Sequence, residues 1–162
     1  MKKKSVKKKD PIKEMSNKEL CLVRNQGDWD AELARETLIS RDPRLAKKLT
    51  DATIDEAMIS YFEKEHTYGD IECWDVSNVT DMNSMFSSCY EFNADLSKWT
   101  VSNVTDMEGM FYDCQEFNAD LSKWNVSKVT NMDYMFIYCY KFNSDLSAWD
   151  VRNVTDTEGM FH

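Results

Sequence analysis

Histidine and the common catalytic motifs are nearly absent from this sequence of 162 residues. It contains two histidines, His66 and His162, and neither lies beside a recognisable nucleophile or carboxylate motif. The sequence has no P-loop, no G-x-S-x-G nucleophile elbow and no H-E-x-x-H zinc motif. These absences argue against a hydrolase or a nucleotide-dependent enzyme, and we expect a protein without catalytic activity.

Long apolar runs are also missing. No run of 18 apolar residues occurs, and the first 20 residues contain no apolar core of the kind that a secretory signal needs. A membrane span and export by a cleaved signal are therefore not expected. The simplest interpretation is an intracellular protein, cytoplasmic or nuclear.

Positive charge is concentrated at the start of the chain. Residues 1–13 hold seven lysines and one aspartate, a net charge of +6, whereas the whole chain carries −9, so the remainder carries −15. We interpret residues 1–13 as a basic disordered tail that either keeps the protein in solution or contacts an acidic neighbour. No aromatic residue or arginine is interleaved, so contact of residues 2–9 with nucleic acid or an anionic surface would be weak and salt-sensitive.

A repeat of 25 residues dominates the rest of the sequence. Four tryptophans recur at this interval: Trp74, Trp99, Trp124 and Trp149. The sequence around them recurs with few changes, as in WDVSNVTDMNSMFSSCYEFNADLSK and WTVSNVTDMEGMFYDCQEFNADLSK. A fixed period of this length predicts a stack of identical supersecondary units. We assign about three and a half repeats to residues 70–162.

Within one unit, the apolar spacing suits neither a long strand nor a long helix. A short strand is expected at Leu96-x-x-Trp99-x-Val101, followed by tight turns. One such unit cannot offset the conformational entropy of its own ordering, about 1.5 kcal/mol per residue. It therefore needs a neighbour stacked about 4.8 Å away, and stability should come mainly from contacts between units.

These residues carry a resemblance to a known family. LSKWTVSNVTDMEGMFYDCQEF resembles the BspA-like leucine-rich repeat, in particular the 25-residue repeat of mycoplasma surface lipoproteins, which is also seen in algal and large DNA virus proteins. The resemblance covers residues 53–162. It implies a right-handed solenoid with a narrow parallel sheet on one face, and a surface or interaction module of unknown activity.

The segment before the repeats has helical patterns, and we assign residues 14–69 to a helical N-terminal region and cap. Helices are expected after the capping box Ser16-x-x-Glu19 and from about Trp29 to Ser40. A last helix is expected to open at the box Thr53-x-x-Glu56. Its inward stripe is predicted to comprise Ile54, Met58, Ile59, Tyr61 and Phe62. We expect this helix to cover the open edge of the first repeat.

Cysteines and aspartates recur with the repeat, and each set raises the question of a metal site. Cys89, Cys114 and Cys139 share one repeat position and are expected to pack as a buried column, because three stacked rungs spread them too far for one zinc ion. Asp95 and its equivalents are expected to cap turns; calcium binding is the alternative. We predict no metal and no cofactor.

Two surfaces are candidates for a protein partner. The first is the sheet face, where positions beside the buried residues differ between repeats; its residues are Lys98, Thr100, Ser102, Lys123, Asn125, Ser127, Asp150 and Arg152. Neutral drift of exposed positions explains these differences equally well. The second is a tyrosine group on the outer turns, made of Tyr112, Tyr134, Tyr138 and Tyr140.

The sequence as a whole predicts an α/β repeat fold: a helical N-terminal cap followed by a short leucine-rich-like solenoid with a narrow parallel sheet. The predicted function is a non-enzymatic interaction or scaffold module that binds a protein partner. The last unit stops at His162 without a capping helix, so self-association through an uncapped final repeat is also expected. The alternative is a structural subunit of a larger assembly, such as a virion component, whose lysine-rich tail binds an acidic neighbour or nucleic acid.

Overall fold

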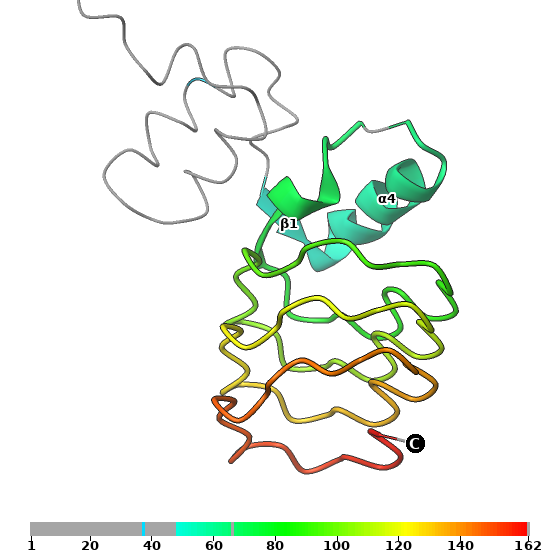
Figure 1. Ribbon diagram of the computed structural model, residues 1–162. Coiled ribbons are helices and arrows are strands. Elements are labelled where there is room, and N and C mark those ends of the chain that lie inside the picture. Colours follow the sequence, from blue (N-terminus) through cyan, green and yellow to red (C-terminus); the bar gives the residue numbers. More distant parts are fainter. Residues whose placement is uncertain (1–36, 38–47, 66, 162) are drawn as a thin grey trace, which may run out of the picture.

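A helix lies at one end of a stack of coils. The computed structural model describes Thr37, residues 48–65 and residues 67–161. Its elements are strand β1 (Lys48–Thr50), helix α4 (Asp51–Phe62), a short 3-10 helix (Ile71–Cys73) and strand β2 (Asp75–Asn78). Beyond them the chain winds in successive coils, one above another (Figure 1). We name the coils by their 25-residue units: the first is 74–98, the second 99–123, the third 124–148 and the fourth 149–161.

The expectations for the N-terminal part of the chain fall mostly outside this region. The basic tail of residues 1–13 and the helices expected between residues 14 and 47 lie outside the described residues, apart from Thr37. The helix expected to open at Thr53 is within them.

That helix begins three residues earlier than the sequence suggested. Thr50 is its N-cap, and the backbone N–H of Thr50 donates to the Thr53 hydroxyl oxygen at 3.0 Å. Thr53 therefore occupies the third helical position rather than the N-cap. The predicted capping box of Thr53 with Glu56 was wrong. The physical reason is that a hydroxyl at the third position can satisfy the N-cap amide as a glutamate does.

The inward stripe of α4 is also narrower than predicted. Ile54, Ala57 and Met58 are buried, whereas the side chains of Ile59 and Phe62 are 57% and 48% exposed. Spacings of three and four residues place the buried set on one face and the exposed pair on another. The helix still covers the first coil, because the Tyr61 ring meets the rings of Trp74 and Phe92 edge-on at 6.1 and 6.4 Å.

Strand pairing in the described region is sparse. β1 and β2 form a two-stranded parallel sheet. Between the coils, single parallel bridges join Asp81 to Asp106, Asp106 to Asn131 and Asn131 to Asp156. The strand expected over Leu96–Val101 is not formed. There the backbone closes tight turns instead: the Trp99 N–H donates to the Leu96 carbonyl at 3.0 Å.

The coils are joined by a ladder of backbone hydrogen bonds over alternate residues. In the first coil, the N–H groups of Met82, Ser84 and Phe86 donate to carbonyl oxygens 24 residues later, at 3.0, 2.8 and 2.9 Å. The same pattern joins the second coil to the third and the third to the fourth. To present alternate N–H groups to one side, the chain takes left-handed backbone at Ser84 and Ser88, with φ of 55° and 61°. Equivalent residues of later coils do the same, including Gly109 and Tyr134.

The core is built of columns that run through the stack. Phe86, Phe111 and Phe136 stack with ring centroids 5.5 and 5.7 Å apart. Each tryptophan indole N–H from Trp99 onward donates to a backbone carbonyl 28 residues earlier; for Trp124 the acceptor is the Leu96 oxygen at 3.0 Å. Apolar packing and these side-chain hydrogen bonds therefore both connect neighbouring coils.

Candidate functional site

The cysteine column is a packing feature. The Cys114 thiol donates to the Phe86 carbonyl at 3.0 Å, and the Cys139 thiol donates to the Phe111 carbonyl at 2.9 Å. Burial raises the pKa of Cys139 to about 11 and the pKa of Cys114 further. The thiols are therefore held protonated at neutral pH, and a protonated thiol is a poor nucleophile and metal ligand. Cys89, Cys114 and Cys139 form no disulfide bond with another cysteine in the described part of the chain.

The aspartate columns serve the turns. Asp95, Asp120 and Asp145 each accept the backbone N–H of the serine two residues later at 2.9 Å. The hydrogen bond from Ser97 lowers the pKa of Asp95 below its usual value. Within the described residues, no group of three or more histidine, cysteine, aspartate or glutamate side chains is placed to hold a metal ion.

A second acidic column contains one substitution that relieves repulsion. Asp81, Asp106 and Asp156 share a repeat position with Asn131. The Asn131 side-chain amide donates to the carboxylates of Asp106 and Glu108, at 3.4 and 3.1 Å. An amide therefore separates carboxylates that would otherwise stack as like charges.

The residues predicted for the sheet face are exposed or half-buried, but part of their polar capacity is used locally. Asp150 and Arg152 form a bidentate ion pair, at 2.8 and 2.7 Å. The Asn125 side-chain oxygen accepts the Ser127 N–H at 3.1 Å. Thr100 is exposed without a hydrogen bond in the described structure. The sheet face is therefore polar, and some of its hydrogen-bonding groups are already paired with one another.

The tyrosine group is brought together only in part. The rings of Tyr112 and Tyr138 meet edge-on at 5.9 Å, and Tyr138 lies 6.2 Å from Tyr140. Tyr138 and Tyr140 are 40% and 72% exposed. Tyr134 has no ring contact with them; a side-chain hydrogen bond to Glu158 raises its pKa. We call Tyr112, Tyr138 and Tyr140 the tyrosine cluster.

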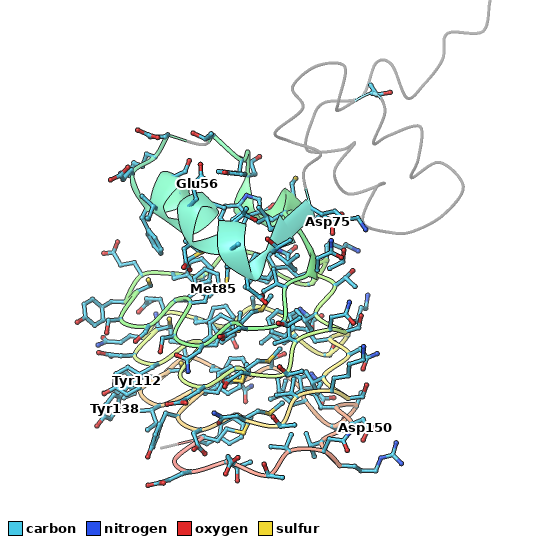
Figure 2. The ribbon with its side chains drawn as sticks, turned by 180° about the vertical axis from the view of Figure 1, so that it is seen from behind. Glu56, Asp75, Met85, Tyr112, Tyr138 and Asp150 are labelled. Carbon is cyan, nitrogen blue, oxygen red and sulfur yellow. The ribbon has the colours of Figure 1, made fainter. Side chains whose placement is uncertain are left out.

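The two candidate surfaces lie on opposite sides of the stack. Figure 2 shows Asp75 and Asp150 along one side of the coils and Tyr112 and Tyr138 along the other. A single compact partner segment cannot cover both sides at once, so the two surfaces are separate candidates.

A third feature was missed by the sequence reasoning. A hollow of about 650 Å³ lies beside α4 and is lined by Tyr61, Phe62, Lys64, Cys89, Tyr90, Glu91 and Phe92. Phe62 was expected on the inner face of the helix. The heptad-like spacing of Asp55, Ile59 and Phe62, which begins with a charged residue, was the signal that this face is exposed.

The edge of the fourth coil carries unpaired donors. Within the described residues, the N–H groups of Thr157, Gly159 and Phe161 have no acceptor, although their equivalents in earlier coils donate to the next coil. Two copies apposed in register through this edge would set N–H groups against N–H groups. Self-association here stays a prediction, and this hydrogen-bond pattern disfavours an in-register pairing.

Comparison with known proteins gives one family match for this chain. Residues 56–162 match the family model described as "Mycoplasma protein of unknown function, DUF285". No curated protein and no solved structure matches the chain. In the part of the chain that the structure describes, no helix is both long and apolar enough to cross a membrane.

Proposed function

We propose a protein-binding role for this chain, which belongs to the DUF285 family of Mycoplasma proteins of unknown function. The stacked coils form a short leucine-rich-like solenoid that acts as a non-enzymatic interaction module. The tyrosine cluster is its contact surface for a partner protein.

The exposure of the tyrosine cluster carries this proposal. Monomeric surfaces seldom gather large aromatic side chains unless they serve a contact, and tyrosine is enriched at protein interfaces because it combines apolar area with a hydroxyl. Tyr138 and Tyr140 present their rings from one coil, and Tyr112 adds a ring from the coil before it. A partner that spans two coils can cover all three.

The neighbourhood of the cluster supports a peptide or protein rather than a small molecule. Lys141 and Glu116 form an exposed ion pair at 2.6 Å across the same two coils. An aromatic centre with charged groups beside it has the composition of a protein interface, in which a polar rim surrounds the apolar contact. Burial holds the thiols of Cys114 and Cys139 protonated at neutral pH, which supports a non-catalytic role.

The test is quantitative affinity capture with the full chain as bait. Three baits are compared: the unchanged protein, a double variant Tyr138→Ser with Tyr140→Ser, and a control double variant Thr100→Ala with Asn125→Ala on the opposite side. Circular dichroism and thermal melting first establish that all three are equally folded.

We expect one or more proteins to be captured by the unchanged bait and the control, and to be depleted with the tyrosine variant. Removing two interface tyrosines costs roughly 2–4 kcal/mol of binding free energy, which corresponds to a loss of about 30-fold or more. Equal capture by all three baits would contradict the proposal. If capture were lost only with the control variant, the partner would bind the sheet face instead, which would also contradict the proposal.

A further inference from the structure

The outer face of α4 and the rim of the first coil enclose an apolar groove. Asp55, Ile59 and Phe62 follow one another at spacings of four and three residues, so they lie on one face of the helix, and all three are exposed. Opposite this face is the rim of the first coil with Met85, which Figure 2 shows beside the helix, and with Tyr90, which is 53% exposed.

Two hollows, which share no lining residue, border α4 and the first coil. The larger is the hollow of about 650 Å³ described above. The smaller, of about 250 Å³, lies between α4 and residues 81–85, with Ile54, Met58 and Ile59 from the helix on its wall. We call the two together the cap groove.

Unpaired backbone carbonyls lie along the cap groove. In the second coil the carbonyl oxygens of Asp106, Glu108 and Met110 accept N–H groups from the first coil at 2.8–3.0 Å. The equivalent oxygens of the first coil belong to Asp81, Asn83 and Met85, and within the described residues nothing donates to them. The element that lies there is α4, whose N–H groups beyond its first turn are used inside the helix. These three oxygens are therefore acceptors on alternate residues that no described donor satisfies.

Negative charge surrounds these acceptors. Asp55 and Asp81 line the smaller hollow, and Glu91 lines the larger one. The last turn of α4 contains no basic residue to offset the negative end of the helix dipole, and Glu63 and Glu65 follow it. Lys64 is the single basic residue among those that line the two hollows.

The features together specify an occupant. It has an extended backbone, because N–H groups on alternate residues match the spacing of the three carbonyls. It is basic, because carboxylates line both hollows, and it has aliphatic surface to cover Ile59 and Phe62. A lysine side chain supplies both, since its methylene stem packs on apolar surface while its ammonium reaches a carboxylate.

We propose that the cap groove binds the lysine-rich segment of this same chain, residues 2–9. This segment, KKKSVKKK, has six lysines, one apolar residue and no proline, so every residue can donate a backbone N–H. The 38 residues between it and β1 span up to about 125 Å when extended, which reaches any point of this end of the stack. Because the segment is tethered, its effective concentration at the groove is high and modest affinity suffices.

Charge alone does not select the cap groove. Asp120 and Asp145 are exposed carboxylates in the coils, and their oxygens already accept serine N–H groups. The cap groove differs because it combines carboxylates with apolar walls and unpaired carbonyls. The prediction is therefore that the segment contacts the groove selectively rather than the whole acidic surface.

Zero-length cross-linking with a carbodiimide on the full chain tests this. The reagent joins a lysine to a carboxylate only when the two are in contact, and peptide mass spectrometry identifies the pair. Mixing unlabelled and ¹⁵N-labelled protein at low micromolar concentration separates links within one molecule from links between two. The predicted result is a set of links within one molecule from residues 2–9 to Asp55, Asp81 and Glu91.

Two variants make the test specific. Ile59→Lys replaces an exposed apolar wall residue by a positive charge, and Val151→Lys makes the same change at a residue of the fourth coil that is 50% exposed. We expect the links to the groove to fall by about tenfold or more with Ile59→Lys, which corresponds to about 1.4 kcal/mol, and to persist with Val151→Lys.

Three results would overturn the proposal. Links spread over Asp120, Asp145 and other exposed carboxylates in proportion to exposure would show a non-selective tail. Links found only between differently labelled molecules would make a second copy the source of the occupant. Absence of links from residues 2–9 to the groove, or equal loss in both variants, would show that the groove does not hold this segment.

Discussion

Replacing Trp124 by phenylalanine tests how much of the stability comes from contacts between coils. Trp124 is 3% exposed, and its indole N–H donates to the carbonyl of Leu96, a residue that is fully buried. Phenylalanine keeps a ring in the column but removes the donor. The Leu96 carbonyl then loses this partner in a place that water does not reach.

The magnitude follows from two effects. An unsatisfied buried carbonyl costs about 1–3 kcal/mol, and the smaller ring leaves a cavity that costs about 1 kcal/mol more. We therefore expect Trp124→Phe to lower the free energy of unfolding by about 2–4 kcal/mol. Urea unfolding, followed by the fluorescence of the remaining tryptophans, should show a midpoint lower by about 1–2 M with an unchanged slope.

Trp74→Phe is the matched control. Its indole N–H donates to the Gly69 carbonyl at 3.4 Å, a long hydrogen bond to a residue that is half-buried. Water can replace this donor, so mainly the cavity cost remains, about 1 kcal/mol. Equal losses for the two variants would refute the argument that the indole hydrogen bonds between coils stabilise the stack.

Three further predictions concern other contacts. Asn131→Asp removes the amide that donates to Asp106 and adds a like charge to the column, so the melting temperature should fall at low salt and recover partly at high salt; a salt-independent loss would contradict this. Asp51 accepts the Thr80 N–H and hydroxyl at 2.7 and 2.6 Å, and although burial opposes them, these hydrogen bonds lower its pKa. A carboxyl group with a lowered pKa stabilises the fold above its unfolded pKa of about 3.9, and this stabilisation is lost as the pH falls through the folded pKa. Asp51→Asn should therefore make the free energy of unfolding depend less steeply on pH in the acid range. An unchanged pH dependence would contradict this. Cys114, whose pKa burial raises, should react with a thiol reagent at pH 8 only when the chain unfolds, and rapid modification of the native protein would contradict its burial.

The column positions were predictable because they depend on a period that is visible in the sequence. Tryptophans at 25-residue intervals indicated that identical side chains would stack, and the structure buries Trp74, Trp99, Trp124 and Trp149 at equivalent places. The same argument placed the cysteines in a packed column and the Asp95 set in turns. Each is a consequence of repetition and needs no knowledge of the backbone path.

The path within each coil was not predictable in the same way. Left-handed backbone usually points to glycine, yet Ser84 of the first coil and Tyr134 of the third adopt it at the position where the second and fourth coils have Gly109 and Gly159. The segment around Leu96 was expected to be a strand, because its apolar spacing resembles one. Its backbone instead closes turns, and the ladder begins at Met82, among residues that the spacing assigned to turns.

The sequence pattern also did not predict the contacts that α4 makes with residues far along the chain. Asp51 caps the first coil by accepting the Thr80 N–H, 29 residues away, in the place where later coils offer a threonine carbonyl. Sequence patterns report neighbours along one helix or one strand, and this contact joins two different elements. The exposed face of α4, and with it the cap groove, was missed for a related reason: Ile59 and Phe62 are apolar, and apolar residues were assigned inward.

Hydrogen exchange resolved to single amides tests most directly the claim that a ladder between coils holds this fold together. The N–H groups of Met107, Gly109 and Phe111 donate to the third coil, whereas those of Thr157 and Gly159 have no acceptor within the described residues. We predict that the first three exchange slowly and together, with the free energy of global unfolding, and that the last two exchange rapidly. Equal exchange at all five positions would contradict the account, because it would mean that the coils separate without unfolding the protein.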